Sequence, residues 1–215
     1  MKKKSFLVPT FLFLSFVVWT ILVCIIDTAP IGPRNSTIGF ATLNAFVHKL
    51  TGEHYCLYVI TDWLGILPIC VCIGFAALGF VQMIKRRSIL KVDPSLILLG
   101  GIWLAVIGLY VFFELVPINY RPVLIDGRLE VSYPSSTTML FMTVIPSSMI
   151  ELRTRIKSLL ICRIAIFVSA LVVAFAVIGR IISGVHWMSD IIGAALAAAS
   201  LVSAYSILIK RTREN

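Results

Sequence analysis

The sequence predicts an all-α integral membrane protein, built as a bundle of six transmembrane helices. Of its 215 residues, 59% are hydrophobic and 13% are charged, and the mean hydropathy is +1.00. These values lie far outside the range of soluble globular domains. Because one membrane-spanning helix needs about 20 apolar residues, the chain has room for about six spans joined by short loops. We therefore expect residues 1–215 to form a single membrane domain.

The first span is predicted over about residues 5–26, directly after three lysines. A cleaved secretory signal is the alternative, but the apolar run is too long for a signal core and no small-x-small cleavage site precedes Asp27. Residues 28–55 are mixed in composition and form the longest loop, in which a short interfacial helix would fit. The first segment is therefore interpreted as a retained transmembrane helix.

The other five spans are recognised as apolar runs that end at polar or basic clusters. They are predicted over about residues 57–84, 95–116, 135–150, 159–178 and 186–209. The fourth begins with polar residues and contains Pro146, which predicts that protein or water lines part of it. In the sixth, small residues recur at four-residue spacing from Gly193 to Ser200, which favours close packing against a neighbouring helix.

The basic residues predict how the chain lies in the membrane. Fourteen of the 19 fall in clusters at residues 2–4, 85–91, 153–163 and 210–213. All four clusters are cytoplasmic if the N-terminus is cytoplasmic, as the positive-inside rule requires. The C-terminus is then cytoplasmic too, and residues 28–55, 117–134 and 179–185 face outward. This topology accounts for the net charge of +9 without nucleic acid, and it fits a multi-pass protein of a bacterial inner or plasma membrane.

Four ionisable residues stand at predicted span ends on the outward side: Arg121, Arg180, His186 and Asp190. Such residues at membrane depth are costly and indicate function. His186 and Asp190 are four residues apart, which places both side chains on one helix face. Asp190 can then accept a hydrogen bond from one imidazole nitrogen and leave the other as a nucleophile or base. The two guanidiniums are suited to binding phosphate.

These residues lie in segments that resemble the motifs of the type-2 phosphatidic acid phosphatase (PAP2) superfamily. Residues 179–190, GRIISGVHWMSD, resemble the third motif, which is Ser-Arg, five residues, His, three residues, Asp. Residues 133–137, YPSST, resemble the second motif, Pro-Ser-Gly-His, and Arg121-Pro122 resembles the end of the first, Lys, six residues, Arg-Pro. The order of the motifs matches a six-helix member over nearly the whole chain.

The resemblance implies a phosphatase that needs no metal and no cofactor. It implies that His186 attacks phosphorus to form a phosphohistidine and that Asp190 orients it. It also implies that the phosphate oxygens are bound by the side chains and nearby amides of Arg121, Ser135, Ser136 and Arg180. A lipid phosphate in the bilayer is the expected substrate.

Three positions depart from the family motifs. Thr137 stands where the family has a second histidine, the general acid for the leaving group, and a threonine hydroxyl cannot deliver a proton at neutral pH. Glu114 stands where the first motif has a phosphate-binding lysine. Gly179 replaces the serine of the third motif.

Three interpretations follow from these departures. In the first, the substrate carries a leaving group that needs no proton, as a lipid diphosphate does, and this favours a polyprenyl diphosphate such as undecaprenyl diphosphate. Alternatively, another acid substitutes for the missing histidine. The candidates for that role are Glu114, with a pKa raised by burial, and His54, Asp62, Asp126 and Glu130. In the third interpretation, the protein binds or helps to transport a lipid phosphate without hydrolysing it.

Overall fold

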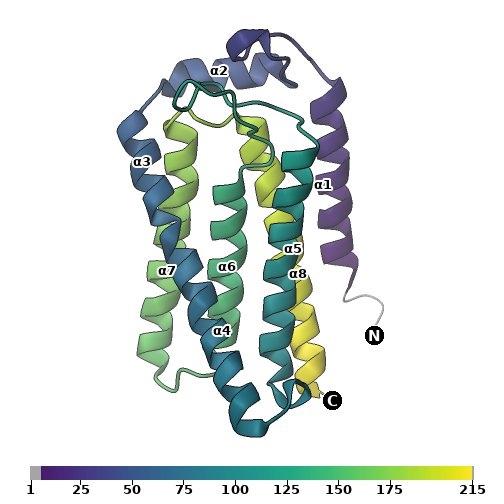
Figure 1. The fold of residues 1–215 in the computed structure, drawn as a ribbon, viewed down its shortest axis with the longest axis vertical. Helices are drawn as coiled ribbons and strands as arrows, with labels where there is room; N and C mark the ends of the chain where they lie inside the picture. Colours follow the sequence, from purple (N-terminus) through teal and green to yellow (C-terminus); the bar gives the residue numbers. More distant parts are fainter. Residues whose placement is uncertain (1–5, 215) are drawn as a thin grey trace.

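The computed structural model describes residues 6–214 as a bundle of long helices (Figure 1). The α-helices are α1 (Leu7–Ile25), α2 (Ala41–Thr51), α3 (Tyr55–Leu64), α4 (Ile66–Arg86), α5 (Pro94–Leu115), α6 (Ser136–Leu152), α7 (Leu159–Ile182) and α8 (Met188–Glu214). Two single-turn 3-10 helices, η2 (Pro33–Asn35) and η3 (Ile89–Lys91), lie in the connections. The described residues contain isolated β-bridges and no strand, so the all-helical prediction is confirmed.

Five stretches of the described chain are long and apolar enough to cross a membrane. They are Leu7–Ile25, Tyr55–Arg86, Pro94–Leu115, Leu159–Ile182 and Met188–Thr212. The predicted fourth span corresponds to α6, which has 17 residues and a length of about 25 Å at 1.5 Å per residue. That is shorter than the hydrocarbon core of about 30 Å. The multi-pass membrane fold is therefore confirmed, whereas a sixth span stays a prediction.

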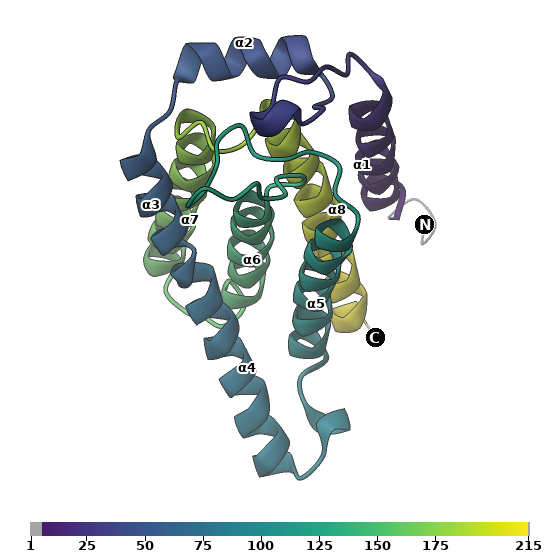
Figure 2. The ribbon, with the colours of Figure 1, turned by 45° about the horizontal axis from the view of Figure 1, so that its top comes forward.

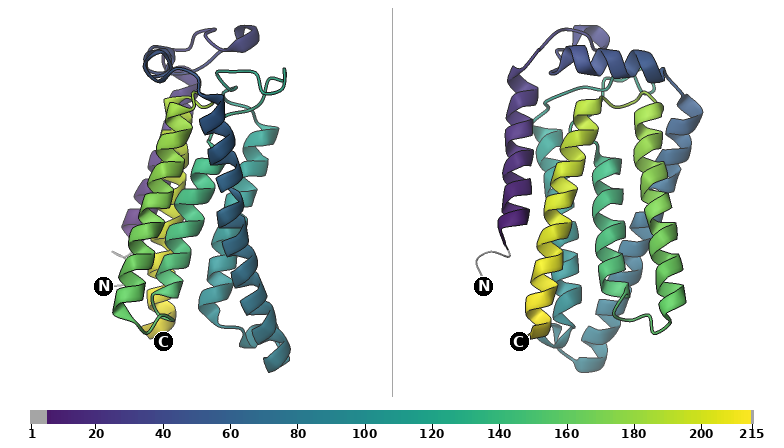
Figure 3. Two further views of the ribbon diagram at one scale, coloured as in Figure 1. Left: turned by 90° about the vertical axis from the view of Figure 1, so that its left-hand side faces the viewer. Right: turned by 180° about the vertical axis from the view of Figure 1, so that it is seen from behind.

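Helix α8 packs against α1 and α6 along a run of small residues. Ala194, Ala197 and Ala198 are all buried, and the Ser200 hydroxyl donates to the Pro9 carbonyl of α1 at 3.1 Å. Small side chains let helix backbones approach closely where lipid supplies no hydrophobic driving force between them. From behind, α8 lies between α1 and α6 (Figure 3). The packing role predicted for this run therefore matches its burial.

One end of the bundle, which we call the site end, is closed by two segments of irregular chain and one short helix. Residues 117–134, the site hairpin, cross this end above α6, and α2 lies across it at a steep angle to the long helices (Figure 2). The hairpin pairs Tyr120 with Val131. Arg34, from the chain between α1 and α2, donates to the Gly127 carbonyl at 3.0 Å. Residues distant in sequence are therefore assembled at the site end.

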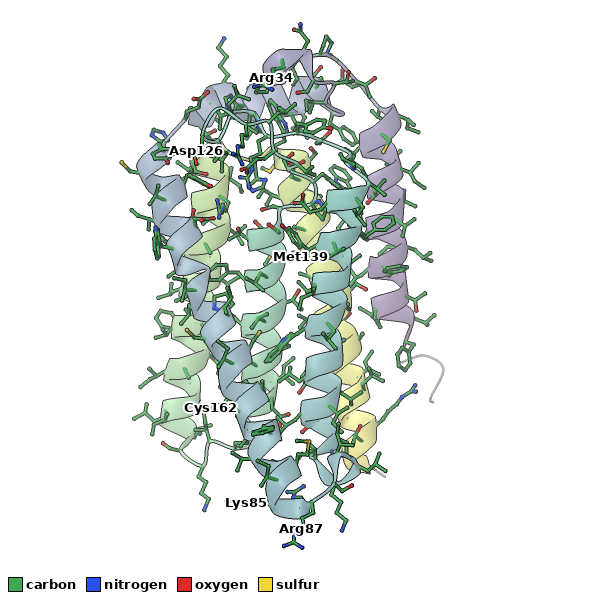
Figure 4. All side chains as sticks on the ribbon, viewed as in Figure 1. Arg34, Lys85, Arg87, Asp126, Met139 and Cys162 are labelled. Carbon is green, nitrogen blue, oxygen red and sulfur yellow. The ribbon has the colours of Figure 1, made fainter. Side chains whose placement is uncertain are left out.

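The opposite end carries the basic turns, so Lys85 and Arg87 lie far from Arg34 and Asp126 (Figure 4). A buried carboxylate ties four helices together there. Glu151 of α6 is 1% exposed, and it accepts hydrogen bonds from Ser95 at 2.9 Å, Tyr205 at 3.0 Å and Arg155 at 2.7 Å. Arg155 also reaches Asp93 at 3.2 Å, which Gln82 and Arg86 contact at 2.8 and 2.9 Å. The ends of α4, α5, α6 and α8 share this network.

Replacing Glu151 by alanine is expected to destabilise the bundle, because three donors lose a buried acceptor. The expected loss is about 2 kcal/mol, within the range for leaving buried polar groups unsatisfied. Thermal unfolding of the detergent-solubilised protein measures it. Glu151→Gln keeps an acceptor oxygen and most of the side-chain volume, so its loss should be smaller. Equal stability of Glu151→Ala and the native protein would contradict this role.

Candidate functional site

The site hairpin positions Arg121 over the start of α8. The backbone amide of Arg121 donates to the Glu130 carbonyl at 2.9 Å, and the Ser132 amide donates to the Asn119 carbonyl at 2.9 Å. These two hydrogen bonds hold the two arms of the hairpin side by side. The Arg121 side chain then lies with Nη1 3.5 Å from Nε2 of His186.

The His186 ring lies between Arg121 and a buried carboxylate. Its Nδ1 is 3.7 Å from Oδ2 of Asp190, one helical turn later. The same Oδ2 accepts the Trp187 amide at 3.0 Å and so satisfies a free N–H at the start of α8. Nδ1 has no hydrogen-bond partner among the described residues, but the negative charge near it favours the tautomer with the proton on Nδ1 and the lone pair on Nε2. The available lone pair therefore faces Arg121.

A glycine lets the chain between α2 and α3 pack closely against the turn that precedes His186. Gly184 has a φ of +70°, and a Cβ built on it would lie 2.1 Å from the Gly52 carbonyl oxygen. Both the left-handed backbone and the close approach exclude larger residues. The glycine two residues before the histidine thus has a steric reason in this chain.

Arg180, near the end of α7, is a buried cation. It is 1% exposed, and its Nη2 donates to Asp62 at 2.6 Å and to the Thr137 hydroxyl at 2.7 Å. Its Nε and Nη1 have no hydrogen-bond partner among the described residues. The Tyr58 ring lies 5.1 Å from its guanidinium carbon and 5.9 Å from that of Arg121, so one aromatic face contacts both cations.

Gly179, which stands where the third PAP2 motif has a serine, lies where α7 packs against α3. A Cβ on Gly179 would lie 2.5 Å from the Thr61 side chain, so a serine would push α3 away. That helix carries Asp62, which neutralises Arg180. The glycine therefore permits the close approach that brings the carboxylate of α3 to the buried guanidinium.

A polar cavity of about 390 Å³ opens beside His186. Its lining includes Arg121, Glu114, Glu130 and Ser136, with Tyr110 and Phe113 from α5 and the residues of the hairpin from Leu129 to Pro134. Arg180 and Thr137 do not line it. The cavity therefore presents the histidine, one guanidinium and two carboxylates to a bound molecule.

The structure places the predicted phosphate-binding serines differently from each other. Ser136 lines the cavity. Ser135 is fully buried; its hydroxyl donates to Thr138 at 3.0 Å, and its amide donates to the Asp190 carbonyl at 3.2 Å. Ser135 thus holds α6 against α8, and its side chain points to its own helix.

The candidate substitute acids also separate into two groups. Glu114 and Glu130 line the cavity, whereas His54 contacts the Thr51 carbonyl at 2.9 Å and Asp126 occupies the tip of the hairpin (Figure 4). Oε2 of Glu130 lies 3.0 Å from Nε of Arg121, although that N–H is not aligned for a hydrogen bond. Asp62 is the partner of Arg180. Among the described residues, Glu114 forms no ion pair with either arginine. The carboxylate beside Arg121 is that of Glu130.

A buried polar network behind Asp190 was not predicted from the sequence. Asn119 donates to Asp190 at 3.0 Å and to Ser189 at 3.3 Å. Asn44 of α2 donates to the Ser189 hydroxyl at 2.9 Å and accepts the Ser189 amide at 3.1 Å. All four residues are at most 1% exposed. Single uncharged amides carry no periodic signal in the sequence, and only their burial and hydrogen bonds show that they support the carboxylate.

Burial and neighbouring cations keep His186 neutral. Burial lowers the pKa of His186 well below its ordinary value of 6.5, and the charges of Arg121 and Arg180 lower it further. Since an imidazole is nucleophilic only when unprotonated, the ring is ready to attack an electrophile near neutral pH. A bound anion would be attracted to the same cations.

Comparisons with known proteins bear on the fold. No family model and no curated protein sequence matches the chain. One solved structure does, described as the crystal structure of the first transmembrane PAP2 type phosphatidylglycerolphosphate phosphatase from Bacillus subtilis. The two share 17% sequence identity with a TM-score of 0.60, and the match covers 96% of each chain. The protein therefore has the fold of a transmembrane PAP2-type phosphatase.

The depressed pKa of His186 predicts how the free protein responds to acid. In ¹⁵N NMR of histidine-labelled protein in micelles, the His186 ring should stay neutral as the pH falls well below 6.5, with His186→Asn identifying its signal. Unfolded chains take up that proton near pH 6.5, whereas the folded state does not. This residue should therefore lower the free energy of unfolding as the pH falls below that value. Titration of His186 near pH 6.5 would contradict the prediction.

Proposed function

We propose that this protein is a membrane lipid phosphatase that hydrolyses a lipid phosphate or diphosphate through a phosphohistidine on His186. The observation that carries the proposal is the buried His186 ring at the wall of a polar cavity, with Nε2 3.5 Å from the Arg121 guanidinium and Asp190 behind Nδ1. This is the arrangement of a nucleophile, an orienting carboxylate and a phosphate-binding cation. The PAP2-type fold supports the same reaction class.

In the proposed reaction, the Nε2 lone pair of His186 attacks phosphorus. The bond from phosphorus to the leaving oxygen breaks, and its electron pair departs with that oxygen. Water then attacks the phosphoryl group, the P–N bond breaks, and inorganic phosphate and neutral His186 are released. Arg121 stabilises the charge that develops on the transferred oxygens, while the buried charge of Arg180 supports the same site from behind Thr137.

The leaving group decides the proposed substrate. Thr137 occupies the position of the missing general acid and accepts a hydrogen bond from Arg180 at 2.7 Å, so its role is to hold the guanidinium. A lipid diphosphate expels a phosphate monoester, which needs no proton, whereas a lipid monophosphate expels a basic alkoxide. We therefore propose a polyprenyl diphosphate, for example undecaprenyl diphosphate, as the preferred substrate. Glu114 is the cavity residue best placed to supply a proton to a monophosphate.

We further propose that the site lies at the extracytoplasmic face of a plasma or bacterial inner membrane. The basic turns at Lys85 and Arg87 lie at the end of the bundle opposite the site (Figure 4), and basic residues mark the cytoplasmic side. Both termini are then cytoplasmic. A substrate whose chain lies in the outer leaflet would present its phosphate at the site end.

Purified protein should release phosphate from undecaprenyl or farnesyl diphosphate faster than from phosphatidic acid. His186→Ala should reduce the release by about a thousandfold or more, the scale at which loss of a catalytic nucleophile acts. Free phosphate is the readout. If no substrate releases phosphate while the native protein still binds the lipids, the alternative of a non-catalytic lipid-phosphate binder or transport component replaces this proposal.

Thr137→His restores the side chain that the second motif has at this position. If the missing acid limits cleavage of monophosphates, hydrolysis of phosphatidic acid should rise by about a hundredfold, at the low end of general acid catalysis, while diphosphate hydrolysis changes little. Thr137→Val is the matched control, because it also removes the hydroxyl bonded to Arg180 but adds no acid. An equal rise for both substrates in Thr137→His would show that the leaving group is not the limit.

A further inference from the structure

Helix α2 presents three different faces, each repeating at three- and four-residue spacing. Ala41, Asn44 and His48 form the face toward the bundle: the first two are buried, and the His48 ring lies 5.5 Å from the Trp187 ring. Because positions three and four apart are neighbours on a helix, residues 42, 45 and 49 form a second face and residues 43, 46 and 50 a third. The two outer faces differ in character.

The third face, which we call the α2 stripe, is apolar and uncovered. It consists of Leu43, Phe46 and Leu50, whose side chains are 38%, 66% and 76% exposed. The second face, with Thr42, Ala45 and Lys49, is also exposed but carries a hydroxyl and a charge. A helix that lies in a bilayer interface has this division, with apolar side chains toward the acyl chains and polar ones toward water.

The position of α2 in the fold matches that division. The helix crosses the site end of the bundle at a steep angle to the spans (Figure 2), and in the side view of Figure 3 it is seen nearly end-on, just beyond the ends of the long helices. Tyr55 and Trp63, early in the α3–α4 span, are 63% and 70% exposed, and aromatic residues of this kind are enriched at membrane interfaces. The α2 stripe therefore lies at the end of the bundle where these aromatic residues begin the next span.

We propose that the lipid interface at the site end is the binding partner of the α2 stripe, and that this contact holds Asn44 against the carboxylate network of the site. The link is short: Asn44 bonds Ser189 at 2.9 Å, and Asn119 joins Ser189 to Asp190 at 3.3 and 3.0 Å. Membrane contact on the outer face of α2 thus stabilises the polar network that Asn44 joins on the inner face, and this network positions Asp190 behind His186. The first part stands on the geometry of α2; the second part rests on the proposed phosphatase activity.

Photocrosslinking of the full chain tests the first part. The photoreactive residue p-benzoylphenylalanine replaces Phe46 in one protein, Ala45 in a matched control and Phe11 in a positive control, because Phe11 is 70% exposed on the α1 span. Each is irradiated in vesicles of phosphatidylcholine and phosphatidylglycerol and analysed by mass spectrometry. Lipid adducts at 46 and 11 that exceed those at 45 several-fold are expected. Equal adducts at 45 and 46, a crosslinked dimer at 46, or adducts at 11 alone would overturn the lipid assignment.

Phosphate release in the same vesicles tests the second part. Phe46→Ser combined with Leu50→Ser should lower the rate several-fold, while Ala45→Ser, on the polar face, leaves it unchanged. An unchanged rate in the double variant of an active protein would overturn the coupling. If the native chain releases no phosphate, the proposed function fails, yet the crosslinking result still decides whether α2 contacts lipid.

Discussion

The guanidinium of Arg180 must be neutralised inside an apolar bundle, and the arrangement of three helices depends on that requirement. A buried unpaired charge is strongly destabilising, so α3 supplies Asp62 and α6 supplies Thr137 to the same nitrogen. Gly179 lets α3 approach closely enough for this contact. The two remaining nitrogens have no hydrogen-bond partner among the described residues.

The second requirement is a rigid carboxylate behind the histidine. Asp190 is satisfied by Asn119 of the site hairpin and by the start of its own helix, while Ser189 beside it is bonded to Asn44 of α2. The site hairpin, helix α2 and the start of α8 therefore all contribute to one pair of residues, Ser189 and Asp190. The proposed nucleophilic role of His186 depends on a fixed carboxylate behind the imidazole, and the hairpin and α2 hold that carboxylate in place.

Apolar runs predicted the membrane class and most helix positions, and the spacing of small residues predicted the packing run of α8, because both are strong signals in a sequence. The length of α6 was harder to predict. This helix begins beneath the hairpin and is covered by α5, α7 and α8, so it is not required to match the bilayer thickness.

The positions of the predicted spans and the distribution of basic residues also indicated that Arg121, Arg180, His186 and Asp190 would share one end of the bundle. The supporting amides of Asn44 and Asn119 could not be predicted, since a single polar residue looks the same in the sequence whether its side chain is buried or solvated. The ion-pair partner of Arg121 could not be predicted either, because Glu114 and Glu130 are equally acidic in the sequence and only Glu130 faces the guanidinium in the fold.

The central claim is that His186 itself accepts the phosphoryl group. Rapid mixing of the protein with a lipid diphosphate that carries ³²P in its terminal phosphate, followed by alkaline denaturation and peptide mapping, tests it directly. The claim predicts an alkali-stable, acid-labile label on the peptide that contains His186, formed before phosphate is released and absent in His186→Ala. Phosphate release without label on this peptide, or with label on another residue, would contradict it.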